Sequence, residues 1–353
     1  MSDEDPSGPT KVADIEVLVE QAKGGNVDAQ YELARHYLDD PESRDEVEAA
    51  KLLAEGVRKD HLLAQYDLAV LLSEGQQISH NYARAAALFE KAAEQGLPEA
   101  SFSLGILYLI GRGRRKNAKL GTDLVRKAAK KDVPEAAYTL GVMYRDGIEV
   151  KEDPKKAFEW FEKAANQGHV EAQVNLSLCY AHASGTEQNF NQAVHWGELA
   201  AKSSHPDAIN NLAELYLQDN PEEAVRLMKT AAEAGNLDAM SSLGFIYYEG
   251  IGVSNDSLEA MKWWKMAAEF DDAESQYRLA CLYSDDEDVP EDQSLASRWF
   301  QKAAEHGHAD AQFNLGFMYE LGETLPESAT IAARWYERSA AQGHPLAQVK
   351  IGE

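Results

Sequence analysis

The 353-residue sequence predicts an all-α protein, a right-handed α/α superhelix (solenoid) of about nine helix-turn-helix repeats of 36 residues. Three observations predict this fold. A small residue recurs at a nearly fixed interval, apolar residues follow it at spacings of four that place them on one helix face, and Gly and Pro stand where helices should end and begin. No alternation of apolar and polar residues that would indicate β-strands competes with this pattern.

The first helix of each repeat is marked by a small residue, then an apolar residue and, in most repeats, Tyr at intervals of four. In one repeat these residues are Ala136, Leu140 and Tyr144, which share one face of a helix. Successive small residues are 35 or 36 positions apart, except for one interval of 31. They are Ala29, Ala64, Ala100, Ala136, Ala172, Ala208, Ala239, Ser275, Ala311 and Ala347.

The second helix of each repeat begins about 13 residues after the Tyr, as in residues 157–165, which read AFEWFEKAA. All 6 tryptophans of the chain fall in second helices. Five of them occupy one repeat position that holds Leu elsewhere, which predicts a packing position. Gly168 and its counterparts end second helices, and Pro134 and its counterparts begin first helices. Asp153 followed by Pro154 predicts a capped start for one second helix.

These signals predict one solenoid over residues 12–353. We expect an acidic, disordered tail over residues 1–11, a cap helix over residues 12–25 and a partial repeat over residues 345–353. The expected repeats are 26–61, 62–97, 98–133, 134–169, 170–205, 206–236, 237–272, 273–308 and 309–344.

The repeat pattern resembles the Sel1-like repeat (SLR) family, a 36-residue relative of the tetratricopeptide repeats. Residues 136–168 and 311–343 carry the resemblance most closely, and it extends over residues 12–353. The resemblance implies a helical scaffold that acts as an adaptor holding other proteins, in signalling, regulation or complex assembly. Some secreted members of the family carry a cysteine pair in each repeat and bind β-lactams. This chain lacks those pairs, so that activity is not expected.

Composition limits the partners and the compartment. The chain has 34 Lys and Arg against 60 Asp and Glu, a net charge of −26, which makes nucleic acid or an anionic membrane an unlikely general partner. No apolar run approaches the length of a membrane-spanning helix, and the first residues do not resemble a secretion signal. Only 2 cysteines occur, which form no disulfide framework. We therefore expect a cytoplasmic protein.

Catalytic and metal-binding motifs are absent from the sequence, so we expect no enzyme activity, no cofactor and no metal site. His169, His205, His308 and His344 occupy the same turn between repeats, which indicates an architectural role. Cys179 and Cys281 are expected to be buried structural thiols. A hydrolytic or small-molecule activity in a groove remains the weakest alternative.

The face of the first helices opposite the core is unusually apolar. It comprises the positions two before, two after and five after the repeat Leu. Either neighbouring first helices stack through these residues, or they line a groove that binds a protein or peptide. Under the second hypothesis the candidate residues are Tyr138, Val142, Arg145, Asn210, Glu214, Phe245, Tyr248 and Phe317.

Charge is distributed unevenly. Residues 111–131 carry nine basic residues against one acid, and residues 285–292 are rich in Asp and Glu. The basic segment is either a solvated surface or an auxiliary contact for an acidic protein segment, with phosphate or nucleic acid as the weaker ligand. The acidic segment is either a solvated turn or a complement to the basic segment of another copy. The candidate contact residues are Arg112, Arg114, Arg115, Lys116 and Lys119.

Two departures from the repeat predict further features. The sixth repeat is five residues short, so its loop over residues 217–223 is either a neutral deletion or a bend that shapes the groove. The last residues form only half a repeat, either a short frayed cap or an end-to-end docking surface. A homo-oligomer formed through this end is the alternative to partner binding.

Overall fold

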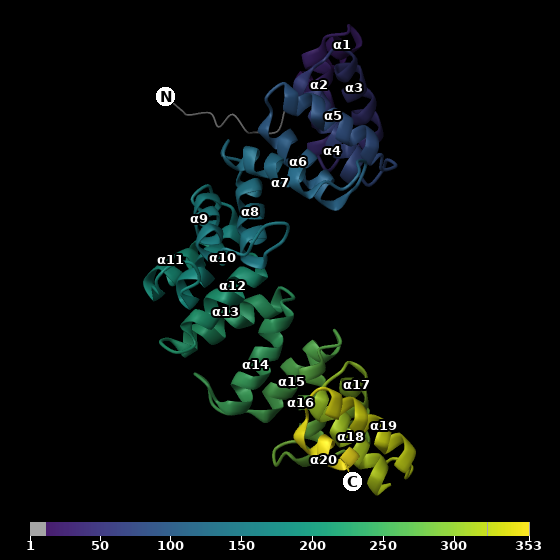
Figure 1. Ribbon diagram of the computed structural model, residues 1–353, viewed down its shortest axis with the longest axis vertical. Coiled ribbons are helices and arrows are strands. Elements are labelled where there is room, and N and C mark those ends of the chain that lie inside the picture. The colour runs from purple at the N-terminus through teal and green to yellow at the C-terminus, as the bar shows by residue number, and fades with distance from the viewer. Residues whose placement is uncertain (1–11, 323, 353) are drawn as a thin grey trace. The chain divides into compact units, whose positions relative to one another are not determined.

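The computed structural model describes residues 12–322 and 324–352, and within these residues the chain forms twenty helices and no strand (Figure 1). The prediction of an all-α fold is confirmed. The tail over residues 1–11 lies outside the described residues.

The chain divides into two compact units. Unit 1 comprises the residues up to Ala172 together with Ser184–Thr186, and unit 2 comprises Gln173–Ala183 and the residues from Glu187 onward. The boundary falls within α10. The helices of the first unit are α1 Val12–Lys23, α2 Val27–Asp39, α3 Glu46–Arg58, α4 Leu62–Glu74, α5 Tyr82–Glu94, α6 Pro98–Ile110, α7 Ala118–Ala129, α8 Pro134–Asp146 and α9 Pro154–Ala165. From the boundary onward they are α10 Val170–His182, α11 Phe190–Ala201, α12 Pro206–Tyr216, α13 Pro221–Glu233, α14 Leu237–Glu249, α15 Ser257–Ala268, α16 Ala273–Asp285, α17 Gln293–Glu305, α18 Ala309–Leu321, α19 Ala329–Ala341 and α20 Pro345–Gly352.

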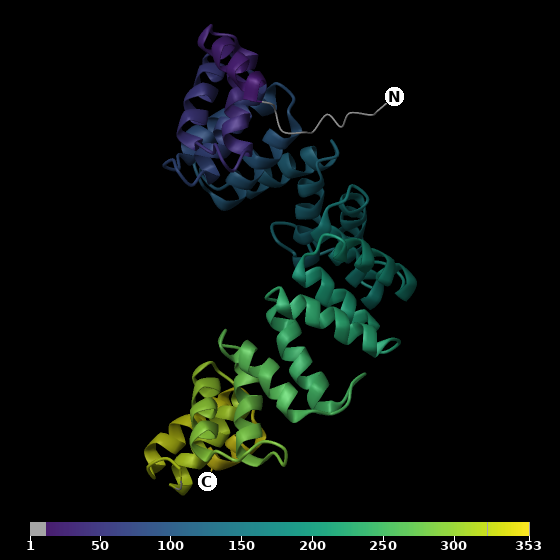
Figure 2. The same cartoon turned by 180° about the vertical axis from the view of Figure 1, so that it is seen from behind.

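Within each unit, a helix packs mainly against the helix before it and the helix after it in the chain, as Figures 1 and 2 show for α16 to α20. This one-dimensional packing is the defining property of a solenoid. The first helices of the repeats are α2, α4 and the other even-numbered helices, and the second helices are α3, α5 and the other odd-numbered helices. Helix α1 packs on α2 in the place of a second helix, as expected for a cap.

In four repeats a glycine follows the repeat Leu and lets the two helices approach closely. In α14, a Cβ on Gly244 would collide with the indole of Trp264 on α15. Trp264 is only 2% exposed, and Phe161, Phe300 and Tyr336 occupy its place in other repeats. The buried aromatic residue is therefore the one after the position that the sequence singled out.

The tryptophan position predicted from the sequence lies at the edge of this core. Trp160, Trp196, Trp299 and Trp335 are half-buried, whereas Trp263 is buried. A cation lies over the ring in three cases: Lys163 on Trp160, Lys302 on Trp299 and Arg338 on Trp335, with the cation 4.4–5.7 Å from the ring centroid. The position is thus one of packing and of partial exposure at the same time.

Every second helix from α3 to α19 starts at an Asp, Asn or Ser whose side chain accepts a backbone N–H of the first turn. The backbone N–H of the same capping residue donates to the carbonyl of the repeat Tyr, or of Leu72 in the second repeat. The short loop of the sixth repeat keeps this bond, at 2.8 Å between Asn220 N and Tyr216 O. The deletion therefore removes loop residues without removing the capping contact.

Histidines in the turns between repeats cap the first helices. The Nδ1 atoms of His61, His169, His308 and His344 accept the backbone N–H three residues later, at 3.1–3.3 Å. Each ring also packs on an aromatic ring of the first helix of its own repeat, with centroids 4.3–5.0 Å apart. This geometry confirms the architectural role of three of the four turn histidines named from the sequence. His205 is exposed and makes no such cap, and Val174 stands where the first helix of the same repeat would supply the aromatic ring.

The histidine cap predicts different effects for two otherwise equivalent substitutions. We expect His308→Ala to lower the free energy of unfolding by about 1–2 kcal/mol, because it removes a helix cap, a stacked ring pair and the hydrogen bond to Glu274. We expect His205→Ala to change the free energy of unfolding by less than about 0.5 kcal/mol, since this side chain is exposed and caps no helix. Urea titrations followed by circular dichroism measure both. Equal effects of the two substitutions would contradict the capping role.

Candidate functional site

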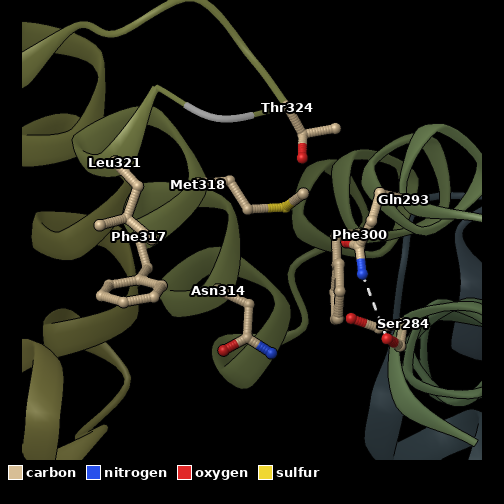
Figure 3. Close-up of a pocket in the computed structure, with 8 residues that line it drawn as sticks. All are labelled: Ser284, Gln293, Phe300, Asn314, Phe317, Met318, Leu321 and Thr324. Atoms are coloured by element: carbon tan, nitrogen blue, oxygen red, sulfur yellow. Dashed lines mark hydrogen bonds between the residues drawn. The ribbon is translucent and has the colours of Figure 1, made fainter.

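Three pockets follow one another along the first helices of unit 2. The pocket between α16 and α18, shown in Figure 3, has a volume of about 290 Å³. Phe317, Met318 and Leu321 reach into it from α18, and Phe300 faces them from α17. On its far side Gln293 donates a hydrogen bond to the carbonyl of Ser284 at 3.1 Å. The remaining lining residues are Asn314 and Thr324.

The other two pockets join the first one. The middle pocket, of about 330 Å³, shares Ser284, Phe300 and Asn314 with it. The third pocket, of about 290 Å³, lies beside α14 and shares Trp264 and Arg278 with the middle pocket. Because neighbouring pockets have walls in common, we treat them as one feature, the unit-2 groove.

First helices supply the walls of the unit-2 groove and second helices supply its floor. Phe245 on α14 and Phe317 on α18 are 42% and 43% exposed, which is high for a phenylalanine. Trp264 and Phe300 lie beneath, 2% and 5% exposed. Tyr248, the third predicted groove residue of this unit, is half-buried and lines the middle pocket. The structure therefore brings Phe245, Tyr248 and Phe317 to one groove.

Charged groups occupy defined places in this groove. Arg278 Nε lies 2.6 Å from Glu274 Oε1, and His308 Nε2 lies 2.9 Å from Glu274 Oε2. The hydrogen bond with His308 and the contact with Arg278 lower the pKa of Glu274 to about 2. The middle pocket is lined in addition by Asp285 and Asp286. Asp286 accepts hydrogen bonds from the Ser257 hydroxyl and from two backbone N–H groups.

The two cysteines differ in their environment. Cys179 is buried, as expected, whereas Cys281 is only half-buried and lines the middle pocket. The expectation of a buried Cys281 is wrong, because this residue lies at the edge of the core cluster and also lines the middle pocket. Desolvation raises the pKa of the Cys281 thiol, which disfavours the reactive thiolate.

The sixth repeat forms a separate pocket of about 580 Å³ between α10, α11 and α12. Glu214 lines it, and desolvation raises the pKa of this carboxyl group. Asn210 is buried, and its Nδ2 donates to Glu214 Oε1 at 3.1 Å. A partner could thus contact Glu214 directly, whereas Asn210 acts on it from beneath.

The predicted groove residues of unit 1 take part in packing. The ring of Tyr138 stacks on His169, with centroids 4.6 Å apart. Val142 is half-buried on α8, and Arg145 pairs with Asp146 at 2.6 Å. Tyr138 therefore packs on the turn that precedes the next first helix, whereas Phe102, at the same repeat position, lines a pocket of about 400 Å³ with Ile106 and Ile110.

Three basic residues of residues 111–131 contact neighbouring repeats. Arg112 lies over the ring of Tyr82 at 5.2 Å, Arg114 pairs with Glu90 at 3.1 Å, and Lys116 pairs with Glu149 at 2.7 Å. The loop lies so close to the preceding repeat that a Cβ on Gly113, whose φ is +69°, would collide with the Tyr82 carbonyl. Arg115 and Lys119 are exposed.

The sequence analysis did not predict several residues that line the unit-2 groove. They include Trp264, Arg278, Phe300, Met318 and Leu321. Arg278 and Asn314 precede the repeat Leu directly, and Leu321 follows it by six positions. The accessible face is thus rotated about the helix axis from the predicted one, because the predicted aromatic column packs on the turn histidines. An aromatic residue at that column together with His in the following turn was the signal that could have shown this.

The described residues also lack a membrane-spanning helix and a cluster of metal ligands. Over residues 12–322 and 324–352 no helix is both long and apolar enough to span a bilayer. Among the same residues no group of three His, Cys, Asp or Glu side chains is arranged to hold a metal ion.

Comparisons with known proteins identify relatives of the repeats. The family model described as "Sel1 repeat" matches nine segments: 27–61, 62–97, 98–133, 134–169, 170–205, 206–236, 237–269, 273–308 and 309–344. Among solved structures, the protective antigen c5321 of uropathogenic Escherichia coli, which displays an SLR fold, matches with 27% identity and a TM-score of 0.67. That match covers 96% of this chain and 81% of the antigen. A Sel1 repeat protein from Oxalobacter formigenes matches with 28% identity and a TM-score of 0.50, covering 100% and 94% of the two chains. The search of curated proteins finds no match.

The low pKa of Glu274 predicts a pH-dependent contribution to stability. Because the pKa is lower in the folded chain than in the unfolded chain, the contribution is complete above the ordinary Glu pKa and is lost as the pH falls towards 2. We expect Glu274→Gln to be less stable than the unchanged chain at about pH 5, and the gap to narrow at about pH 3. Urea midpoints at both pH values measure the gap. A gap that stays constant or widens on acidification would contradict this coupling.

Proposed function

We propose that this chain, which belongs to the Sel1 repeat family, is a non-enzymatic scaffold that binds a protein partner in the unit-2 groove. Sel1 repeat proteins mediate protein–protein interactions. The proposal adds the place of binding to that family property. We also propose a cytoplasmic location. Both cysteines are free thiols, and thiols stay reduced in the cytoplasm.

The observation that carries the proposal is the exposure of large apolar side chains within one continuous groove. Phe245 and Phe317 expose more than two fifths of their surface at opposite ends of it, and Leu321 exposes 49%. Complete burial of such a side chain is worth about 1.5–3 kcal/mol, and covering the exposed part of each would contribute roughly half of that. Aromatic side chains set in pockets are the usual anchors of protein interfaces. A partner segment that covers these residues would gain this free energy.

The groove exists only because repeats stack in register. Each of its three pockets is lined by residues from at least two repeats, and the floor comes from second helices. The binding surface is therefore a property of neighbouring repeats together, as in other repeat scaffolds.

Homotypic assembly is a second candidate, favoured by exposed patches of opposite charge. Lys119, Lys127, Lys130 and Lys131 are exposed on α7 and the turn that follows it. Residues 285–292 are acidic and largely exposed. If these patches join two copies, light scattering should show a larger mass at low salt than at high salt, because screening weakens such contacts. A mass that is independent of salt would exclude this candidate.

Partner binding in the groove predicts the effect of removing its aromatic anchors. We expect Phe245→Ala with Phe317→Ala to lower the capture of partners by the immobilised chain at least about tenfold, as truncation of interface anchors does. Quantitative mass spectrometry of the captured proteins measures the loss.

A matched control removes two exposed apolar side chains outside the three pockets, by Leu258→Ala with Phe270→Ala. These residues are 46% and 67% exposed. Capture should be unchanged in this control. If the groove variant captures as much as the control, the proposed function is wrong.

A further inference from the structure

We propose that the partner segment held in the unit-2 groove is basic and amphipathic, with a Lys or Arg side chain between two apolar side chains. This inference rests on the proposed function and names the chemistry of the partner. Three observations lead to it: the order of the pockets, the balance of charge inside the groove and the charge of unit 2.

The three pockets differ in chemistry, and the acidic one lies in the middle. The pocket beside α14 is mainly apolar, and its only charged lining residues, Glu274 and Arg278, form an ion pair. Its apolar lining residues are Leu217, Phe245, Ile246, Ile251 and Trp264. The pocket beside α18 has an apolar wall of Phe300, Phe317, Met318 and Leu321, shown in Figure 3, and polar residues on its remaining sides. The middle pocket alone contains Asp285 and Asp286. The order apolar, acidic, apolar is complementary to a segment that presents apolar, basic and apolar side chains in turn.

The charges inside the groove leave two carboxylates without a cation. Arg278 is the one basic side chain among the lining residues of the three pockets, and Glu274 already pairs with it. The hydrogen bonds of Asp286 come from a hydroxyl group and backbone N–H groups, which carry no charge. Within the described part of the chain, no Lys, Arg or His forms an ion pair with any acid of residues 285–292. An acidic segment would meet repulsion at the middle pocket, and a basic one would meet attraction.

The charge of unit 2 acts in the same direction. Its sequence contains 11 Lys and Arg against 29 Asp and Glu, a net charge of −18. A field of this sign speeds the approach of a basic segment at low ionic strength. The apolar pockets then determine how long it stays, because burial of apolar side chains controls dissociation.

The inference can be tested with three labelled model peptides of equal length. One contains Leu and Lys in an amphipathic order, the second replaces each Lys with Glu, and the third replaces each Leu with Ser. Fluorescence anisotropy with the full chain should show binding of the Leu/Lys peptide. The other two peptides should bind at least about tenfold more weakly, since one lacks the charge and the other lacks the apolar side chains.

Reversing one groove charge tests the place of binding. Asp285 is exposed and is the last residue of α16, where a cation is favourable for the helix, so Asp285→Lys should fold. This variant should lose about tenfold in affinity for the Leu/Lys peptide and gain affinity for the Leu/Glu peptide. The control Glu233→Lys removes an exposed acid from the second helix α13, away from the three pockets, and should change both affinities less than about twofold.

The outcomes separate this inference from the proposed function. The inferred basic character of the partner segment is wrong if Asp285→Lys and Glu233→Lys change the two peptide affinities equally. It is also wrong if the Leu/Glu peptide binds the unchanged chain as tightly as the Leu/Lys peptide. The proposed function would still stand if loss of Phe245 and Phe317 abolished partner capture. If those substitutions leave both capture and peptide binding intact, both proposals are wrong.

Discussion

The packing of each helix against its two neighbours in the chain is the constraint on which the rest of the structure depends. No repeat closes a core alone. Trp264 fills the space beside Gly244 within its own repeat, and the core cluster around it continues into the repeats before and after it. Polar side chains support the same junctions. Buried Gln276 and Gln312 donate to the carbonyls of Ala268 and Ala304 at the ends of the preceding second helices. Stability is therefore shared between neighbours, and so is the shape of any surface they form.

This constraint explains why a groove lies along the first helices of unit 2. Trp264, Phe300 and Tyr336 of the second helices are buried in the core. In α16 and α18, the aromatic residue two places before the repeat Leu packs on the capping histidine. The next positions around the first helix have no packing role, so Phe245 and Phe317 remain accessible. Acidic residues are concentrated where one first helix ends, at Asp285 and Asp286. Neighbouring positions of a first helix therefore differ in role: one packs on a histidine, the next is accessible in the groove, and the last ones carry negative charge.

The sequence was sufficient for the helices and insufficient for the orientation of their faces. Spacings of four between Ala136, Leu140 and Tyr144 predicted the first helices, and Phe245, Tyr248 and Phe317 were predicted to share a groove that the structure contains. Tyr138 and Asn210 were placed in the same set because periodicity alone cannot separate a stacking seam from an open face. For Tyr138 the distinction depends on His169, which lies at the other end of the repeat. For Asn210 it depends on Glu214, one helical turn further along α12. The fastening of Arg114 to Glu90 likewise depends on a contact between repeats, which one repeat read by itself does not contain.

Hydrogen exchange of the full chain, alone and saturated with the Leu/Lys peptide, tests the central claim most directly, because it locates a ligand without removing any side chain. The account predicts simultaneous added protection in three first-helix segments from three repeats, at residues 241–248, 278–286 and 314–321. Added protection confined to the second helices, to unit 1 or to a single repeat would contradict a continuous binding groove formed by stacked neighbours.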